Sequence, residues 1–223
     1  MLLFLSCSKK SEIIKDKNEI NVEDQEIYNV VFNDIIGHDS ISRNILNFYN
    51  DIQTEAENNF YPSNRKEYEE SRLNELSKTD IDSAQLHVFV NNEIVNLKEA
   101  HDISNIISND NFKYNFTEVD TAYIQLLKEL NNFTEITAFN VSQLSTGFNY
   151  KIISNASDFK EDKNNLSIGR ISFSRIMYNK SKSKACVYAQ HICGGECGGG
   201  HITFLKKIDN KWVISGRKNL WVA

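Results

Sequence analysis

The chain has 223 residues, 40% of them hydrophobic, and a formal net charge of −5. A chain of this length can bury a sizeable core. The length therefore excludes a mini-protein that depends on disulfides or metals for stability, and it favours a single domain. The longest run resembling a membrane segment is Met1 to Leu5, far shorter than the roughly 20 apolar residues of a spanning helix. We therefore predict no transmembrane helix.

The first residues resemble the cleavage site of a bacterial lipoprotein. Phe4-Leu5-Ser6-Cys7 resembles a lipobox, whose cysteine is acylated and becomes the new N-terminus, although Phe is unusual at its first position. A secretory signal also has a basic start and a longer apolar region, so we expect translation to begin upstream. Residues 1–6 are then a signal-peptide remnant, Cys7 the lipidation site and 7–22 a flexible tether, too polar to fold alone. The alternative is a cytosolic protein with an accidental apolar start.

Residues 23–168 predict a mixed, mainly helical part. Apolar residues at helical spacing followed by Gly37 predict a helix over Glu23 to Ile36. Residues 44–54 suit either a helix or a strand, and residues 55–76 are predicted to be partly helical.

Later in this part the pattern remains mixed. Thr79-Asp80 can cap a short helix through Asn91, although Leu86 to Val90 alone would pass as a strand. The clearest later helix is Asp120 to Leu130, with Asp120 as its cap, and residues 131–165 offer one or two strands.

From Gly169 the apolar pattern changes to the period of two that is typical of strands. Turn-type residues follow at Asn179-Lys180-Ser181 and Asp209-Asn210, and the connection from Cys193 to Gly200 is unusual. Residues 169–223 are thus predicted to be an antiparallel module, and the whole an α+β protein in which N-terminal helices join a meander of about four strands, as one domain. The predicted strands are Ile171–Tyr178, Ala185–Ile192, Ile202–Ile208 and Lys211–Val222.

Several C-terminal motifs together resemble an uncharacterised family of bacterial exported proteins. They are Phe173-Ser174-Arg175-Ile176, Tyr178-Asn179, Ala185-Cys186-Val187-Tyr188, Cys193-Gly194, Cys197-Gly198-Gly199-Gly200, Leu205-Lys206-Lys207, Lys211-Trp212 and Leu220-Trp221-Val222. The likeness covers about the last 55 residues. Met177 replaces the family's glycine, and the cysteines stand one residue further apart than in the family. The resemblance implies an exported β module and no particular activity.

The segment from His191 to His201 carries the most unusual chemistry. Cys193 and Cys197 can form a disulfide that closes a hairpin, which suits an exported protein. The alternatives are a zinc site built from His191, Cys193, Cys197 and His201, since two Cys and two His form a legal ligand set, or redox-active thiols. Because zinc sites usually use two separate knuckles, we favour the disulfide and no cofactor. With Cys7 lipidated and Cys193 paired with Cys197, Cys186 is the expected buried free thiol. The candidate binding-loop residues are Gly194, Gly195, Glu196, Gly198, Gly199 and Gly200.

For the other polar and aromatic residues we expect a structural role before a functional one. His38-Asp39 and His101-Asp102 are dipeptides at helix caps, and His87 is expected to be partly buried. Arg175, a charge within an apolar strand, either faces water or pairs with an acid, and an ion pair is the first expectation. A set of aromatic residues could stack on a sugar or peptide, but such residues more often form the core face of a sheet. That set is Trp212, Trp221, Tyr178, Tyr188 and Phe204.

The charges are unevenly distributed along the chain. Residues 1–168 hold 15 Lys+Arg and 28 Asp+Glu, a net −13, whereas residues 169–223 hold 10 and 2, a net +8. The basic part could meet an anionic partner, but we expect it to dock beside the acidic part, and an exported location argues against nucleic acid.

The sequence therefore predicts a non-enzymatic lipoprotein that binds or scaffolds at the cell envelope, facing the periplasm from the outer membrane. Its partners would be the membrane, through the lipid, and an envelope protein or other component. The alternatives are a thiol-redox or zinc protein, and an immunity or inhibitor protein that blocks one partner.

Overall fold

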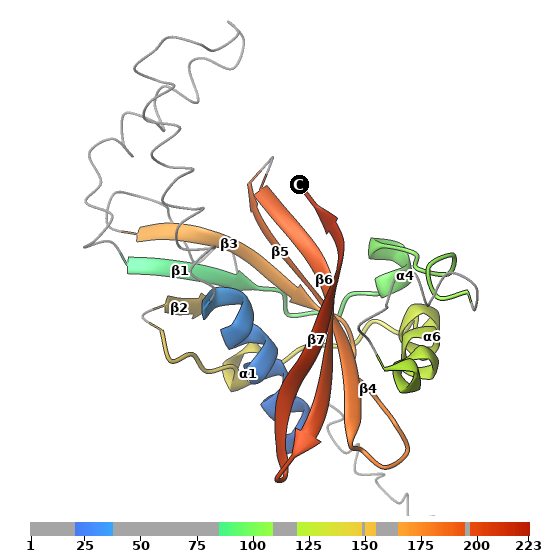
Figure 1. The fold of residues 1–223 in the computed structure, drawn as a ribbon. Coiled ribbons are helices and arrows are strands. Elements are labelled where there is room, and N and C mark those ends of the chain that lie inside the picture. The colour runs from blue at the N-terminus through green and yellow to red at the C-terminus, as the bar shows by residue number, and fades with distance from the viewer. Residues whose placement is uncertain (1–20, 38–84, 109–119, 149, 155–164, 195–196) are drawn as a thin grey trace, which may run out of the picture.

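The computed structural model describes residues 21–37, 85–108, 120–148, 150–154, 165–194 and 197–223 (Figure 1). Cys7, most of the tether and the segments 44–54 and 55–76 lie outside the described residues, as do Gly195 and Glu196. Within the described residues, no helix is long and apolar enough to cross a membrane.

The described part combines three α-helices with a seven-stranded sheet of order β2-β1-β3-β5-β6-β7, in which the short β4 pairs with β5. The helices are α1 (Val22–Gly37), α4 (Leu97–Ala100) and α6 (Ile124–Asn132), with 3-10 turns η1 (Thr121–Tyr123) and η2 (Val141–Gln143). The strands are β1 (Gln85–Val90), β2 (Tyr150–Ile153), β3 (Asn165–Phe173), β4 (Met177–Tyr178), β5 (Lys184–Gly194), β6 (Cys197–Ile208) and β7 (Lys211–Val222).

The α+β class is confirmed, but the prediction of a four-stranded antiparallel meander is wrong. β1 runs parallel to both β2 and β3, so the sheet is mixed and larger than predicted. Val88 and Val90 of β1 are buried in the sheet, and burial of β-branched side chains there outweighs the weak helix signal of the cap at Thr79-Asp80. The predicted module boundary at residue 169 falls inside β3.

Gly169 explains one irregularity of this mixed sheet. Its φ is +106°, a conformation that side chains other than glycine rarely adopt. A methyl group there would also lie 2.7 Å from the Cα of Cys193 and 2.9 Å from His191 Nε2. The β1–β3 register shifts between His87 and Phe89, at this position.

The two faces of the sheet are covered by different helices, as Figure 1 shows: α1 lies on one side of β5–β7, and α4 and α6 lie on the other. The α1 face buries the alternate residues Ala185, Val187 and Ala189 of β5, and the opposite face buries Cys186 and Tyr188. This alternation is the period of two that the sequence predicted from Gly169 onward.

Ion pairs connect the acidic and basic parts of the chain. Each of the four ion pairs between described residues links an acid before residue 169 to a base after it. The expectation that the basic part docks beside the acidic part is therefore confirmed. The pairs are Glu23 with Lys182 and with Lys207, Asp120 with Lys184, and Asp34 with Arg217.

Candidate binding surface at the disulfide end of the sheet

The predicted disulfide is confirmed: Cys193, near the end of β5, is bonded to Cys197, the first residue of β6. Their Cα atoms are 5.1 Å apart, within the usual range for a bridge. Cys186 is the buried free cysteine, as predicted. Its complete burial raises the pKa of the thiol, so it is not a reactive thiolate.

The two histidines flanking the disulfide lie in different surroundings. His191 is buried, and its Nε2 donates a hydrogen bond to the carbonyl oxygen of Ile168 at 2.6 Å. Burial lowers the pKa of His191, so the imidazole is neutral. His201 lies opposite Ala189 in the sheet register. Among the described residues, no group of three His, Cys, Asp or Glu side chains is placed to hold a metal ion.

The glycine run is largely a strand, which corrects the prediction of a loop from Cys193 to Gly200. β5 continues through Gly194 and β6 begins at Cys197, with Gly199 opposite His191 and Gly200 opposite Gln190. The backbone groups of these glycines are therefore used in the sheet ladder and do not form an anion cradle.

The glycines make room for the indole of Trp221, which lies on the surface of β6. A methyl group on Gly200 would overlap Trp221 Nε1, and it would lie 2.7 Å from Cε2 of the same indole. On Gly198 it would lie 3.3 and 3.4 Å from Cζ3 and Cη2 at the other end of the ring system. Since these two glycines are alternate residues of one strand, the indole lies flat across one sheet face. Gly199 points to the other face, where the nearest atom, the Trp221 carbonyl oxygen, would be 3.5 Å away.

A chain of hydrogen bonds fixes the indole in this position. Trp221 Nε1 donates to the hydroxyl of Tyr188 at 2.9 Å, and this hydroxyl donates to Oε1 of Gln190 at 2.9 Å. Burial raises the pKa of Tyr188, so the hydroxyl keeps its proton and remains a donor. The indole orientation is thus set from β5, through a residue of the buried core.

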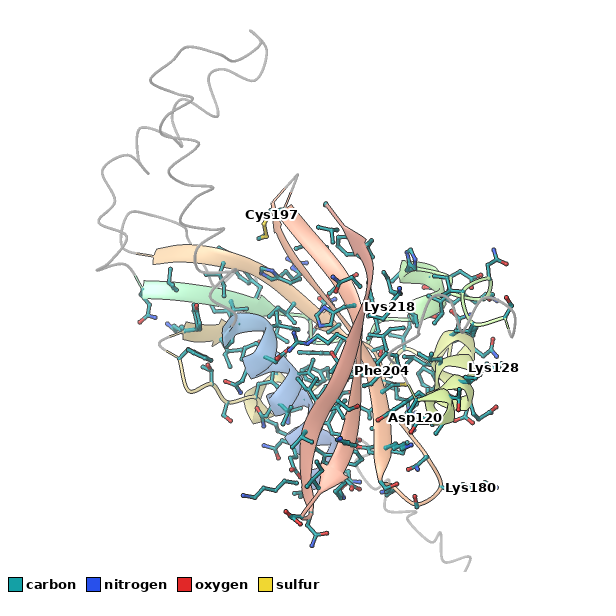
Figure 2. All side chains as sticks on the ribbon, in the orientation of Figure 1. Asp120, Lys128, Lys180, Cys197, Phe204 and Lys218 are labelled. Carbon is teal, nitrogen blue, oxygen red and sulfur yellow. A yellow bond between two sulfur atoms is a disulfide. The ribbon has the colours of Figure 1, made fainter. Side chains whose placement is uncertain are left out.

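Two further residues share this face of the sheet. Ile192 is directly opposite Gly198 on one side and Arg170 on the other, and cross-strand partners project to the same face. Ile192 is 45% exposed, and Arg170 is exposed as well. We call Arg170, Gln190, Ile192 and Trp221 the disulfide-end surface. Figure 2 shows Cys197 at this end of the strands and Lys180 at the opposite end.

The predicted aromatic set divides between core and surface. Tyr188, Phe204 and Trp212 are buried, as the core reading predicts, and Tyr178 is partly buried against Trp212. Trp221 differs, because it is only partly buried and covers glycines. The sequence signal for this arrangement is a tryptophan in a last strand beside a strand with alternate glycines, and it was not recognised.

The other described polar residues that the sequence singled out make contacts within the fold. Asp102 accepts hydrogen bonds from Ser104 and Asn131, and these bonds, led by that of the Ser104 hydroxyl, lower the pKa of Asp102 to about 2. His38-Asp39 lies outside the described residues. Arg175 lies in a break between β3 and β4 and is exposed, which is the water-facing alternative. Its guanidinium is 4.9 Å from the centre of the Phe133 ring, and no ion pair joins it to another described residue.

The fold and this surface define a class of protein: an α+β protein with a mixed sheet, a disulfide-closed hairpin and an aromatic surface beside it. Comparison of the chain with family models, with curated proteins and with solved structures gave no match. The resemblance to a family of exported proteins therefore stays a prediction.

Proposed function

We propose that this protein is an exported bacterial lipoprotein, tethered through Cys7, that binds a component of the cell envelope with its disulfide-end surface. The observation that carries the proposal is the orientation of Trp221 on that surface. Its indole is fixed by Tyr188 beside the exposed Ile192. Pre-ordered aromatic and apolar groups are the kind from which binding hot spots are made.

Two features support an exported binding protein rather than a thiol-redox or zinc protein. A disulfide persists in oxidising compartments and is rare in the cytosol. The imidazole of His191, two residues before Cys193, is neutral and bonded to the carbonyl of Ile168, so it is not a cation that would stabilise a thiolate. The thiol-redox and zinc functions stay alternatives, and both require the Cys193–Cys197 bond to open.

A partner-blocking protein of the immunity or inhibitor type would use the same surface. It differs in binding one protein, so the number and nature of captured components separate the two roles.

The test is site-specific photo-crosslinking in cells, with the crosslinking residue placed at Ile192 or, as a control, at Lys180. Both positions are exposed. Ile192 is next to Cys193, whose disulfide partner Cys197 lies at the opposite end of the strands from Lys180 (Figure 2). We expect discrete adducts in the envelope fraction from position 192 and none from 180. In parallel, Cys7→Ser should release the protein from membranes. Equal labelling from both positions, or a Cys7→Ser protein that stays in the membrane fraction, would contradict the proposal.

A further inference from the structure

We infer that the disulfide-end surface binds an anionic saccharide, with the Trp221 indole stacked on a sugar ring and Arg170 paired with a carboxylate of the sugar. This inference rests on the proposed function, because an exported protein meets polysaccharides, and it names the ligand of that same surface.

The indole presents one face for stacking. Its inner face covers the Cβ positions of both Gly198 and Gly200, so the outer face points away from the sheet. Trp221 is partly exposed, and its N–H is already bonded to Tyr188. What remains for a ligand is therefore an apolar, electron-rich plane, which attracts the slightly positive C–H groups on one side of a sugar ring.

The polar groups beside this plane offer donors. Gln190 uses its Oε1 to accept the Tyr188 hydrogen bond, which leaves its amide nitrogen to donate. Arg170 lies on the same face, across Ile192, and a guanidinium has five donors and no acceptor. No ion pair joins Arg170 to another described residue. A ligand rich in acceptors and carrying a carboxylate matches this set, because Arg pairs with carboxylates through two parallel hydrogen bonds.

Arg170 is not used to neutralise the acidic part of the chain. Residues 169–223 hold ten Lys and Arg; four of them pair with acids of the earlier part, and Arg170 is not one of these four. The surface is small, with one partly exposed indole and one 45% exposed isoleucine. Its size suits one or two sugar units better than insertion into a lipid bilayer.

The experiment is calorimetric titration of the purified full chain with hexagalacturonic acid and with the neutral cellohexaose. We expect hexagalacturonic acid to bind about tenfold more tightly, as one charge-assisted pair allows. Arg170→Gln should bring the two affinities together, and Trp221→Ala should abolish both. Trp221→Phe keeps an aromatic ring and should retain measurable binding, which separates loss of stacking from loss of fold.

The matched control is Lys180→Gln, which removes one exposed positive charge at the opposite end of the sheet and should change neither affinity. Equal weakening by Arg170→Gln and Lys180→Gln would overturn the inference, because it would mean binding by diffuse charge. So would Trp221-dependent binding of hexathymidylate or of phosphatidylglycerol vesicles without binding of either saccharide. If crosslinks at Ile192 persist while no saccharide binds, this inference fails and the proposed function stands.

Discussion

At the end of the sheet where β6 turns into β7, three carboxylates of α1 hold the strands, whereas the opposite end has a disulfide and an indole. Glu23 pairs with Lys182 and Lys207, and Asp24 accepts a hydrogen bond from Tyr178 at 2.6 Å. Glu26 accepts one from the backbone N–H of Trp212 at 3.0 Å. We call this the turn end, and the other the disulfide end.

We propose that the turn end mainly stabilises the fold and that the disulfide end binds the partner. The turn end buries Trp212, partly buries Tyr178 and uses Glu23, Asp24 and Glu26 in contacts within the chain. At the disulfide end the Cys193–Cys197 bond closes the hairpin and the glycines of β6 lie against the indole, while Trp221 and Ile192 remain partly accessible. A region that is ordered yet uncovered is suited to binding.

The edge strand β7 spans both ends and is protected against pairing with other chains. Two register shifts interrupt its pairing with β6, at Gly200/His201 and Phe204/Leu205. Its exposed positions include the charged Lys211 and Arg217. Bulges and charges are the usual devices by which edge strands avoid aggregation, so we expect partners to approach the face of the sheet.

The largest expected effect separates the two tryptophans of β7. Trp212 is 3% exposed, so Trp212→Ala should lower the free energy of unfolding by about 3–5 kcal/mol. Trp221 is partly exposed, so Trp221→Ala should cost about 1–2 kcal/mol. Urea unfolding followed by circular dichroism measures both. Equal losses would mean that the disulfide end is as much a part of the core as the turn end.

The disulfide should contribute less, and locally. Replacing Cys193 and Cys197 together by Ser should lower the free energy of unfolding by about 2 kcal/mol, because the bond closes a short loop. Amide hydrogen exchange should become faster at His191 and Gly199 and stay unchanged at Lys207. Faster exchange at all three would show that the two ends are not independent.

The smallest effect is the acid response of the turn end. The hydrogen bond from Lys207 holds the pKa of Glu23 below its ordinary value of 4.5, against the opposing effect of burial. A depressed pKa means that this stabilisation is complete above pH 4.5 and is lost as the pH falls through the folded-state pKa. Glu23→Gln should therefore remove about 1 kcal/mol at neutral pH and flatten the loss of stability on acidification.

The control for this prediction is Glu99→Gln, which removes an exposed carboxylate of α4. Thermal unfolding between pH 3 and 7 measures both variants. A Glu99→Gln protein with the same flattened profile would show that the acid response comes from general charge and not from the turn end.

The elements that the sequence predicted well have strong local patterns. The predicted helix Glu23–Ile36 corresponds to α1, and Asp120 caps η1 just before α6 by accepting a hydrogen bond from the Ala122 N–H. The two strands that form the β6–β7 hairpin were also found from alternation and from the turn at Asp209-Asn210. In these segments the side chains and the turn residues favour the same structure.

The parts that were missed depend on contacts between distant residues. Parallel pairing of β1 with β2 joins Leu86 to Tyr150, a partnership that leaves no signal in either segment alone. The glycines of β6 disfavour a strand by propensity, yet the strand forms because it lies between β5 and β7 and is covered by Trp221. The disulfide was predictable from cysteine spacing, whereas the role of the glycines required the position of the indole.

The central claim is that alternate glycines position Trp221 and thereby form the binding surface. The most direct test measures crosslinking from position 192 in cells that carry Gly200→Ala or Gly199→Ala. The first substitution forces the indole to move, and the second meets only an atom 3.5 Å away on the other face. We predict that the adduct is lost with Gly200→Ala and retained with Gly199→Ala. Equal retention, or equal loss, in the two variants would contradict the claim.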